Sequence, residues 1–257
     1  MGEPGLSALE AGLPQLVKEH AVDFTVVNGE NAAEGFGMTQ VDLRRILAAG
    51  ADVITSGNHV WEKRDFWPFL DSEERILRPA NYPAAYGAAA TPGRGWIRLE
   101  KAGAAAPVLV INLQGREFMN AIDCPFRCFD SIVGEARAEN SVVLLDFHAE
   151  SSREKEALAH YLDGRASLVA GTHTHVQTAD ERILPQGTAY ITDLGMTGIS
   201  ASVIGMDPQV CMERANRQIM YRMVPAVPGG AGRPASVQGI IAEIDHETGK
   251  AVSIKRF

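Results

Sequence analysis

Short runs of Val, Ile and Leu alternate with helix-forming segments along this chain, and four of the runs end in side chains able to bind a metal. The four ends are Asn28-Gly29-Glu30-Asn31, Gly57-Asn58-His59, Asp146-Phe147-His148 and Gly171-Thr172-His173-Thr174-His175. Continuous apolar runs suit strands covered on both faces, and their alternation with helices favours an α/β fold. Ligands of open α/β sheets bind beyond the carboxyl ends of the strands. We therefore predict that the four polar ends converge on one site.

The rest of the pattern agrees with this fold class. Apolar residues recur at helical spacing over 6–19 and 41–50. Residues 151–162 are also expected to be helical, with Ser151 or Ser152 as the candidate helix cap. Further strands are expected at 107–116, at 188–195 and in an antiparallel hairpin of 236–245 with 251–257, whereas 79–95 reads as loop. We predict a single domain over 1–257, in which central mixed, mainly parallel strands are flanked by helices.

Composition narrows the class of protein. The apolar fraction of 46% and the charged fraction of 22% are typical of globular chains. A net charge of −8 argues against a broad nucleic-acid surface, although a bound metal can still attract a small phosphate substrate. The first residues lack a signal-peptide pattern and no apolar run reaches about 20 residues. We expect a cytoplasmic protein that does not bind a membrane.

The three cysteines, Cys124, Cys128 and Cys211, do not suggest a zinc site, because their number is odd and no second pair completes a ligand set. We expect them to be small, buried hydrophobic side chains.

His173 and His175 are the strongest metal candidates. In an extended chain they project to the same side with Cα atoms about 6.5 Å apart, which suits two adjacent metals, or one metal bound by a bent loop. Two-metal hydrolases hold their ions about 3.5–4 Å apart and need a bridging carboxylate. Glu30 can supply it, whereas Asp146, two residues before His148, could instead support a ligand. Taken singly, Asn28-Gly29 could be a turn and His148 a hydrogen-bonded histidine at a strand end.

In their order, these motifs resemble those of calcineurin-like metallophosphoesterases, and most closely the bacterial YmdB-type phosphodiesterases. Segments such as NGENAAEGFGMT, LRPANYP, DFHAESSREKEAL and DGRASLVAGTHTHVQTADERILPQGTAYITDLGMTG carry the resemblance over nearly the whole chain. The resemblance implies two iron or manganese ions bridged by Glu30. It implies that Asn31 and His175 complete one ion's shell and that Asn58, His148 and His173 complete the other's.

The resemblance also implies a reaction: hydrolysis of phosphodiesters, with 2′,3′-cyclic nucleotides as favoured substrates and His59 as the proton donor to the leaving oxygen. Paired ions lower the pKa of a bound water and neutralise phosphate oxygens, and an imidazole can donate a proton near neutral pH. Arg116, at the end of another strand, could hold a substrate phosphate with its guanidinium or form a surface ion pair.

The chain departs from the family at its start. The family opens with a strand ending in Gly-Asp, whose Asp binds the first metal, whereas Met1-Gly2-Glu3-Pro4-Gly5 resembles the segment that follows. Because every later motif is intact, we expect that the start was assigned too late and that the strand was not truly lost. In the sequence as given, the sheet would lack a central strand. A non-catalytic regulatory protein on a damaged scaffold and a phosphomonoesterase remain alternatives, and self-association is left open.

Overall fold

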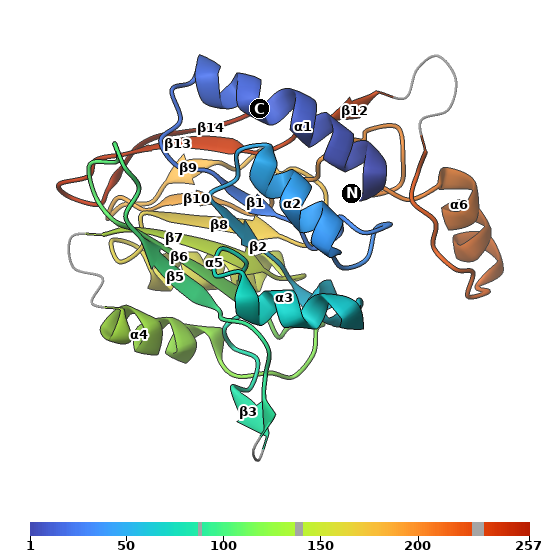
Figure 1. Cartoon of the computed structure of the whole chain (residues 1–257), viewed down its shortest axis with the longest axis horizontal. Coiled ribbons are helices and arrows are strands. Elements are labelled where there is room, and N and C mark those ends of the chain that lie inside the picture. Colours follow the sequence, from blue (N-terminus) through green and yellow to red (C-terminus); the bar gives the residue numbers. More distant parts are fainter. Residues whose placement is uncertain (87–88, 137–140, 228–233) are drawn as a thin grey trace.

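The computed structural model describes residues 1–257 except 87–88, 137–140 and 228–233 (Figure 1). Its helices are α1 (Gly2–Glu19), α2 (Gln40–Ala48), η1 (Asn58–Trp61), η2 (Arg64–Phe66), α3 (Trp67–Ser72), α4 (Pro125–Glu135), α5 (Ser152–Tyr161) and α6 (Pro208–Arg217). Its strands are β1 (Val26–Asn28), β2 (Val53–Thr55), β3 (Ala85–Tyr86), β4 (Ala89–Ala90), β5 (Trp96–Leu99), β6 (Val108–Gln114), β7 (Val142–His148), β8 (Leu168–Thr172), β9 (Arg182–Ile183), β10 (Ala189–Ile191), β11 (Gly198–Ile199), β12 (Ala235–Ser236), β13 (Ile240–Ile244) and β14 (Ala251–Arg256).

The largest sheet has six strands in the order β5-β6-β7-β8-β10-β9. Its four inner strands are parallel, and the two outer strands pair antiparallel with their neighbours. One face packs against α4 and α5 through a cluster that includes Leu113, Phe129, Phe147 and Leu158. The predicted mixed, mainly parallel sheet with flanking helices is therefore confirmed.

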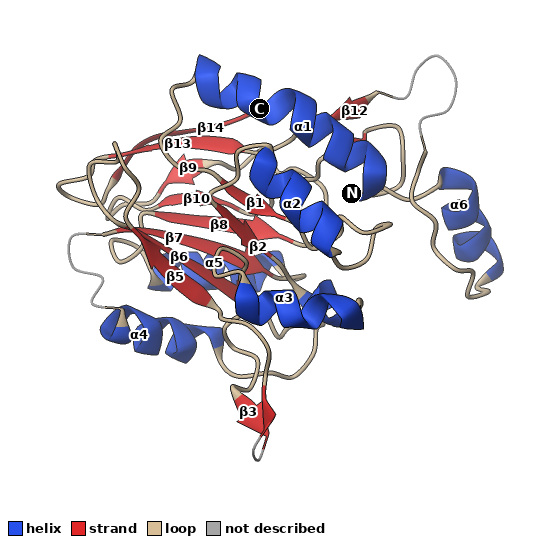
Figure 2. Cartoon of the chain, in the orientation of Figure 1, coloured by secondary structure: helices blue, strands red, loops and turns tan. Residues whose placement is uncertain are grey.

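The other face of this sheet is covered by a second layer of strands. β1 pairs parallel with β2, and a third apolar cluster joins Val53 to Val108 and Val110. On the far side of β1 and β2, helices α1, α2 and α3 pack through Leu9, Ile46 and Leu70, among others. The order of layers is thus helix, sheet, sheet, helix, with the helices outside the strands (Figure 2).

Local sequence accounts for most element boundaries. The Thr39 side chain accepts from the Asp42 backbone N–H and the Asp42 carboxylate accepts from the Thr39 N–H, which is a complete capping box for α2. Ser151, one of the two candidate caps, caps α5, and the predicted hairpin of β13 with β14 forms across residues 245–250. α1 begins at Gly2, earlier than the expected 6–19, because a proline such as Pro4 is tolerated in the first turn. The 79–95 segment, predicted as loop, also contains the short pair β3–β4.

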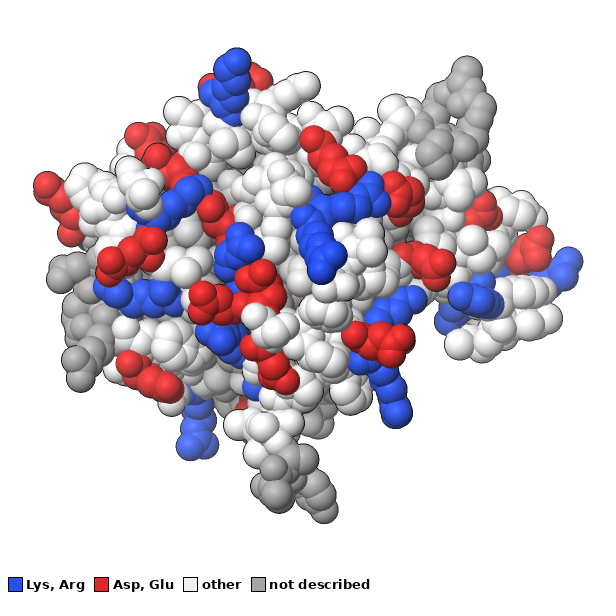
Figure 3. Space-filling model, viewed as in Figure 1, with Lys and Arg blue, Asp and Glu red and all other residues white. Residues whose placement is uncertain are grey.

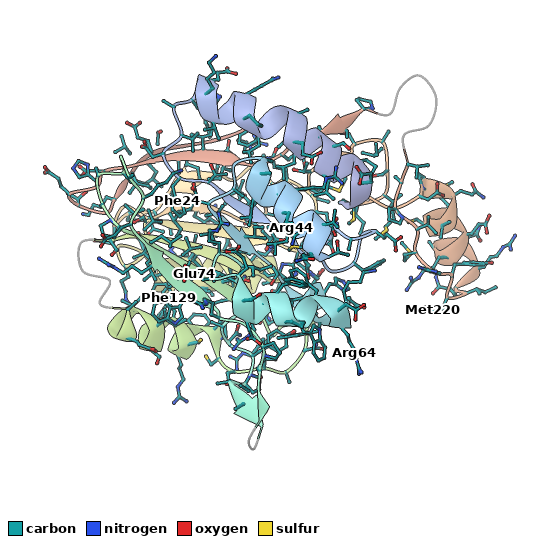
Figure 4. The ribbon with its side chains drawn as sticks, in the orientation of Figure 1. Phe24, Arg44, Arg64, Glu74, Phe129 and Met220 are labelled. Atoms are coloured by element: carbon teal, nitrogen blue, oxygen red, sulfur yellow. The ribbon has the colours of Figure 1, made fainter. Side chains whose placement is uncertain are left out.

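The distribution of charged side chains and the apolar character of the helices bear on the compositional pattern. Basic and acidic side chains are interspersed on the face drawn in Figure 3, without a broad basic area. No helix within the described ranges is both long enough and apolar enough to cross a bilayer. α6 projects from the body with none of its described residues buried, and Met220 beyond it is 79% exposed, whereas Phe129 of α4 is fully buried (Figure 4).

Candidate metal centre

The four polar ends singled out in the sequence lie together at the carboxyl ends of β1, β2, β7 and β8. β1 and β2 belong to one sheet and β7 and β8 to the other, so the site spans the edge shared by both layers (Figure 1). Side chains separated by more than 100 residues come into contact there: Glu30 Oε2 lies 2.9 Å from His148 Nε2. The predicted convergence is what the structure shows.

Three possible ligands surround the Nε2 atom of His148. Glu30 Oε2 is 2.9 Å away, His173 Nδ1 is 3.0 Å away and Asn58 Oδ1 is 3.1 Å away. Ligand atoms of Glu30, His148 and His173 all lie within 4.8 Å of one another. An ion held at about 2.0–2.2 Å by nitrogen and oxygen ligands requires such spacing. One carboxylate, two imidazoles and an amide oxygen therefore fit a metal ion.

Asn31 and His175 form a second pair beside this group. Asn31 Nδ2 is 3.0 Å from His175 Nε2, and the buried Oδ1 atom of Asn31 has no hydrogen-bond partner among the described residues. The His175 Nδ1–H donates to the carbonyl of Ile204, which leaves the Nε2 lone pair directed at Asn31. A half-turn of the Asn31 amide would place its orphaned oxygen beside that lone pair, which is the donor arrangement a second cation requires.

The loop that carries the two histidines is bent rather than extended. His173 has φ 103° and His175 has φ 65°, in the left-handed region where non-glycine residues rarely lie. The expectation of two side chains on one side of an extended chain is therefore wrong. The bend places His173 against His148 and His175 against Asn31, which favours two adjacent metals over one. Strain of this kind costs about 1–3 kcal/mol per residue and gathers at functional sites.

Burial and charge together set the protonation of the group. Burial by itself would raise the pKa of Glu30, but the attraction and hydrogen bond of His148 and the His59 N–H hold it at about 2. Burial would lower the pKa of His148, but the charge and hydrogen bond of Glu30, together with the charge of Asp146, raise it. Burial and neighbouring His148 lower the pKa of His173 to about 4, so this imidazole is neutral near pH 7. Burial also lowers the pKa of His175.

A buried carboxylate, Asp146, ties the strand ends together beneath the candidate ligands. It accepts hydrogen bonds from Asn28 Nδ2, Thr55 Oγ1 and Thr172 Oγ1. Because the Thr172 hydroxyl donates its only proton to Asp146, its oxygen must accept from the Nδ1–H of His148, 3.0 Å away. This bond fixes the ring and directs Nε2 at the site. Asp146 thus supports the ligand His148, one of the two roles left open by the sequence.

His59 lies next to the group without joining it. Its backbone N–H donates to Glu30 Oε1 at 2.8 Å, and its ring Nδ1 is 3.0 Å from Glu62 Oε1. The ring packs edge-on against Phe36 at 5.1 Å between centroids and is 28% exposed. An imidazole held beside the ligands with one face open to solvent can exchange a proton with a bound molecule.

Sequence reasoning missed a buried ion pair behind the His173–His175 loop. Lys155 Nζ on α5 lies 2.9 Å from Asp193 Oδ2, with side chains 1% and 0% exposed. The same Oδ2 accepts from the Thr174 N–H at 3.0 Å, so the pair holds the loop between the two histidines. The sequence did contain a signal for Asp193, because this residue follows the end of the apolar strand β10, as Glu30 follows the end of β1. Glu150, 3.1 Å from His173 Nε2, was also missed.

Two other predicted features lie apart from this group. The Arg116 backbone N–H binds the Glu154 carboxylate, while its exposed side chain makes no ion pair with any described residue, so its substrate role rests on the sequence alone. Cys124, Cys128 and Cys211 are free, but they are only partly buried, whereas full burial was expected. Burial raises the pKa of the Cys128 thiol to about 11.

Known proteins resemble this chain over its whole length. The model of the YmdB-like protein family matches residues 1–257. A Bacillus subtilis protein named 2′,3′-cyclic-nucleotide 2′-phosphodiesterase is 43% identical over 257 residues, covering 100% of this chain and 93% of the relative. A crystal structure of a hypothetical protein from Thermus thermophilus superposes with a TM-score of 0.85 at 38% identity, covering 100% of this chain and 94% of the other.

A structure described as a novel phosphatase from Mycoplasma pneumoniae superposes with a TM-score of 0.90 at 28% identity, covering 100% of this chain and 89% of the other. The resemblance stated from the motifs is therefore confirmed. Since the family model spans every residue and the Bacillus relative is 43% identical over all 257 residues of this chain, the chain belongs to the YmdB-like protein family.

Proposed function

We propose that this protein hydrolyses small phosphodiesters at a dinuclear metal centre. The observation that carries the proposal is the grouping of Glu30, His148 and His173, with ligand atoms within 4.8 Å of one another, next to the Asn31–His175 pair. In the proposed arrangement Glu30 would help to hold both ions. Asn58, His148 and His173 would hold one of them, and Asn31 with His175 would contribute to holding the other.

The proposed roles follow from what each side chain can reach. When bound, paired ions supply an activated water and neutralise the charge on the phosphate oxygens. His148 and His173 hold their ring nitrogens toward that position, since their other nitrogens face Thr172 and Glu150. His59, beside Glu30 but outside the ligand group, gives a proton to the leaving oxygen, and its Nδ1 contact with Glu62 orients the ring.

The finer assignments are also proposals. The name of the Bacillus relative favours 2′,3′-cyclic nucleotides as substrates, because the relative is 43% identical over the full chain. Nitrogen and oxygen donors without a thiolate suit iron or manganese. A cytoplasmic location is part of the same proposal.

The proposal is tested by measuring metal content and hydrolysis on the same preparation. We expect two equivalents of metal and turnover of 2′,3′-cyclic AMP and bis-p-nitrophenyl phosphate. His59→Ala should lower turnover by about 10²–10⁴-fold, as for loss of a general acid, with the metal content unchanged. His160→Ala, on the exposed face of α5, is the matched control and should leave both values unchanged.

Two outcomes would reject parts of this assignment. Loss of metal together with turnover in His59→Ala would make His59 a ligand instead of a proton donor. One ion or none, with no turnover of any ester, would support the non-catalytic alternative.

The Mycoplasma relative described as a phosphatase motivates a second candidate, a phosphomonoesterase using the same ions. Comparing kcat/KM for a diester with that for its matching monoester separates the two. Preference for the diester by tenfold or more, about 1.4 kcal/mol in transition-state binding, supports the first proposal, and the reverse preference supports the second.

A further inference from the structure

The LRPANYP segment, residues 77–83, has no part in the proposed reaction, yet it ends beside the metal centre. Asn81, which is 1% exposed, clamps the end of β6. Its Nδ2 donates to the carbonyls of Gln114 at 2.8 Å and Asp123 at 2.9 Å, and its Oδ1 accepts from the Gln114 N–H at 2.9 Å. This clamp fixes the backbone next to Tyr82, whose hydroxyl donates to Gln114 Oε1 at 3.2 Å.

Gln114 connects Tyr82 to the metal centre. It is the register partner of His148 in the β6–β7 pair, so both side chains project from the same face of the sheet, with the strands about 4.8 Å apart. Gln114 is fully buried, and its Nε2 has no hydrogen-bond partner among the described residues. Buried donors without partners are few in folded proteins, and each calls for a reason other than stability. Here the amide holds the Tyr82 hydroxyl one strand away from a candidate ligand.

Trp61 reaches the same place from the second sheet layer. It lies three residues after Asn58 in η1, and residues at this spacing in a 3₁₀ helix lie on the same side, about 6 Å apart. The indole packs against the apolar cluster of α1, α2 and α3 and meets the Tyr82 ring edge-on, with 5.4 Å between centroids. Both rings are only half-buried. The two candidate ligands Asn58 and His148 are therefore each followed outward by one half of an aromatic pair.

The charge at Tyr82 agrees with this position. Burial raises the pKa of the phenol, and the charge of Glu30 raises it further. Hydrogen bonds with Trp61, Gln114 and Asn120 act in the opposite direction without reversing the shift. Tyr82 is therefore neutral near pH 7 and close enough to Glu30 to sense its charge. A neutral ring at this distance does not repel a phosphate and offers an aromatic surface to the group that the phosphate carries.

We propose that Tyr82 and Trp61 form an aromatic wall against which the base of a nucleoside phosphodiester packs, and that Gln114 is a positioning residue for Tyr82. The inference rests on the proposed function and adds to it the class of ester. With the phosphate at the metal centre, the base lies one ribose farther out, over rings that stand about 6 Å beyond Asn58. Every base has an aromatic face, so the wall selects nucleoside esters over aliphatic ones without selecting among bases.

The first test compares two diesters with the same cyclic phosphate ring, 2′,3′-cyclic AMP and ethylene phosphate, which lacks the sugar and the base. Loss of one stacking contact, worth about 1–3 kcal/mol at 1.4 kcal/mol per tenfold, should lower kcat/KM for 2′,3′-cyclic AMP by about 5–150-fold in Tyr82→Leu. The value for ethylene phosphate should change far less. Trp61→Leu should act in the same way, whereas Tyr82→Phe keeps the ring and should retain most of the preference.

Two further variants separate the wall from general damage to the fold. Gln114→Met should raise KM for 2′,3′-cyclic AMP but not for ethylene phosphate, and a merely structural role would not distinguish the two esters. Tyr161→Leu removes an aromatic ring that is 45% exposed on α5 and is the matched control. It should leave both values unchanged.

Binding distinguishes failure of this inference from failure of the proposed function. Adenosine 3′-monophosphate and inorganic phosphate are titrated into the metal-loaded protein by calorimetry. The nucleotide should bind about 5–150-fold more tightly than phosphate, and Tyr82→Leu and Trp61→Leu should each reduce the difference. Tyr82-dependent nucleotide binding without hydrolysis of any ester would reject the proposed reaction and support the wall.

The inference is overturned if the nucleotide and phosphate bind equally well to the unaltered protein. It is also overturned if Tyr82→Leu lowers kcat/KM for both diesters equally while metal content and Tm stay unchanged. If Tyr82→Leu does not fold, the same two comparisons in Trp61→Leu decide the matter.

Discussion

Replacing Lys155 by Met should destabilise the protein more than any exposed charge change on the same helix. The substitution keeps the length of the side chain but leaves Asp193, which is 0% exposed, without its ion-pair partner. Removal of one member of a buried pair typically costs about 3–5 kcal/mol. That is a large part of the roughly 5–15 kcal/mol by which domains are stable.

The loss of unfolding free energy in Lys155→Met is expected to stay within this range of about 3–5 kcal/mol, because Asp193 retains the N–H groups of Thr174 and Gly195 as donors. Arg153→Met is the matched control on α5. Arg153 is 82% exposed and pairs with Glu117 at the surface, where such pairs are worth about 0–1 kcal/mol. Urea unfolding with a chelator present measures both variants without a contribution from metal binding.

The double variant Lys155→Met with Asp193→Leu separates the effect of the ion pair on stability from its effect on the position of the His173–His175 loop. An apolar pair of similar volume should recover most of the stability. Metal binding should stay weak, because the Thr174 N–H has lost the carboxylate that holds it between His173 and His175. A Lys155→Met variant within about 1 kcal/mol of Arg153→Met would refute the reasoning, as would full metal affinity in the double variant.

Gly57→Ala should abolish metal binding, because its added methyl group would overlap the His148 ring. Gly134→Ala on α4, whose added methyl group would meet no atom within 4 Å, should leave metal binding intact, and inductively coupled plasma mass spectrometry of both purified variants measures the metal content. The free energy of unfolding of the metal-free protein should fall progressively between pH 6.5 and pH 4, because the pKa of His173 is lowered from 6.5 to about 4 in the folded state and the unfolded chain therefore binds more protons. Urea titrations should show a smaller change in unfolding free energy with pH for His173→Gln. Metal binding should release protons and weaken as the pH falls, because the pKa of His148 is raised and its ring must lose a proton before it can bind a metal. If this is wrong, the binding enthalpy measured by calorimetry will be the same in buffers of different ionisation enthalpy.

The sequence predicted the main elements of the fold and the residue types at the site. Val/Ile/Leu runs and helical spacing are local properties, so the parallel strands, α5 with its Ser151 cap and the β13–β14 hairpin could be predicted from neighbouring residues alone. The same reasoning placed Glu30 and His148 at strand ends, where side chains of parallel strands meet.

Contacts between distant residues were not predictable in this way. The division of the strands into two stacked sheets depends on which faces pack together, and that choice is made by side chains far apart in the chain. The bend at His173 and His175 requires positive φ values, which nothing in Gly-Thr-His-Thr-His specifies. It is held by Asp193, which lies just beyond the end of β10, together with the contacts of the two rings.

Sequence by itself therefore determined which side chains are available to bind a metal and on which strand ends they lie, because periodicity and residue chemistry act over a few neighbours. Tertiary structure alone decided how they divide: His173 joins Glu30 and His148, while His175 faces Asn31. It also decided that a buried lysine supports the loop. These features arise from the stacking of two sheets, a free-energy balance over the whole chain that no local pattern encodes.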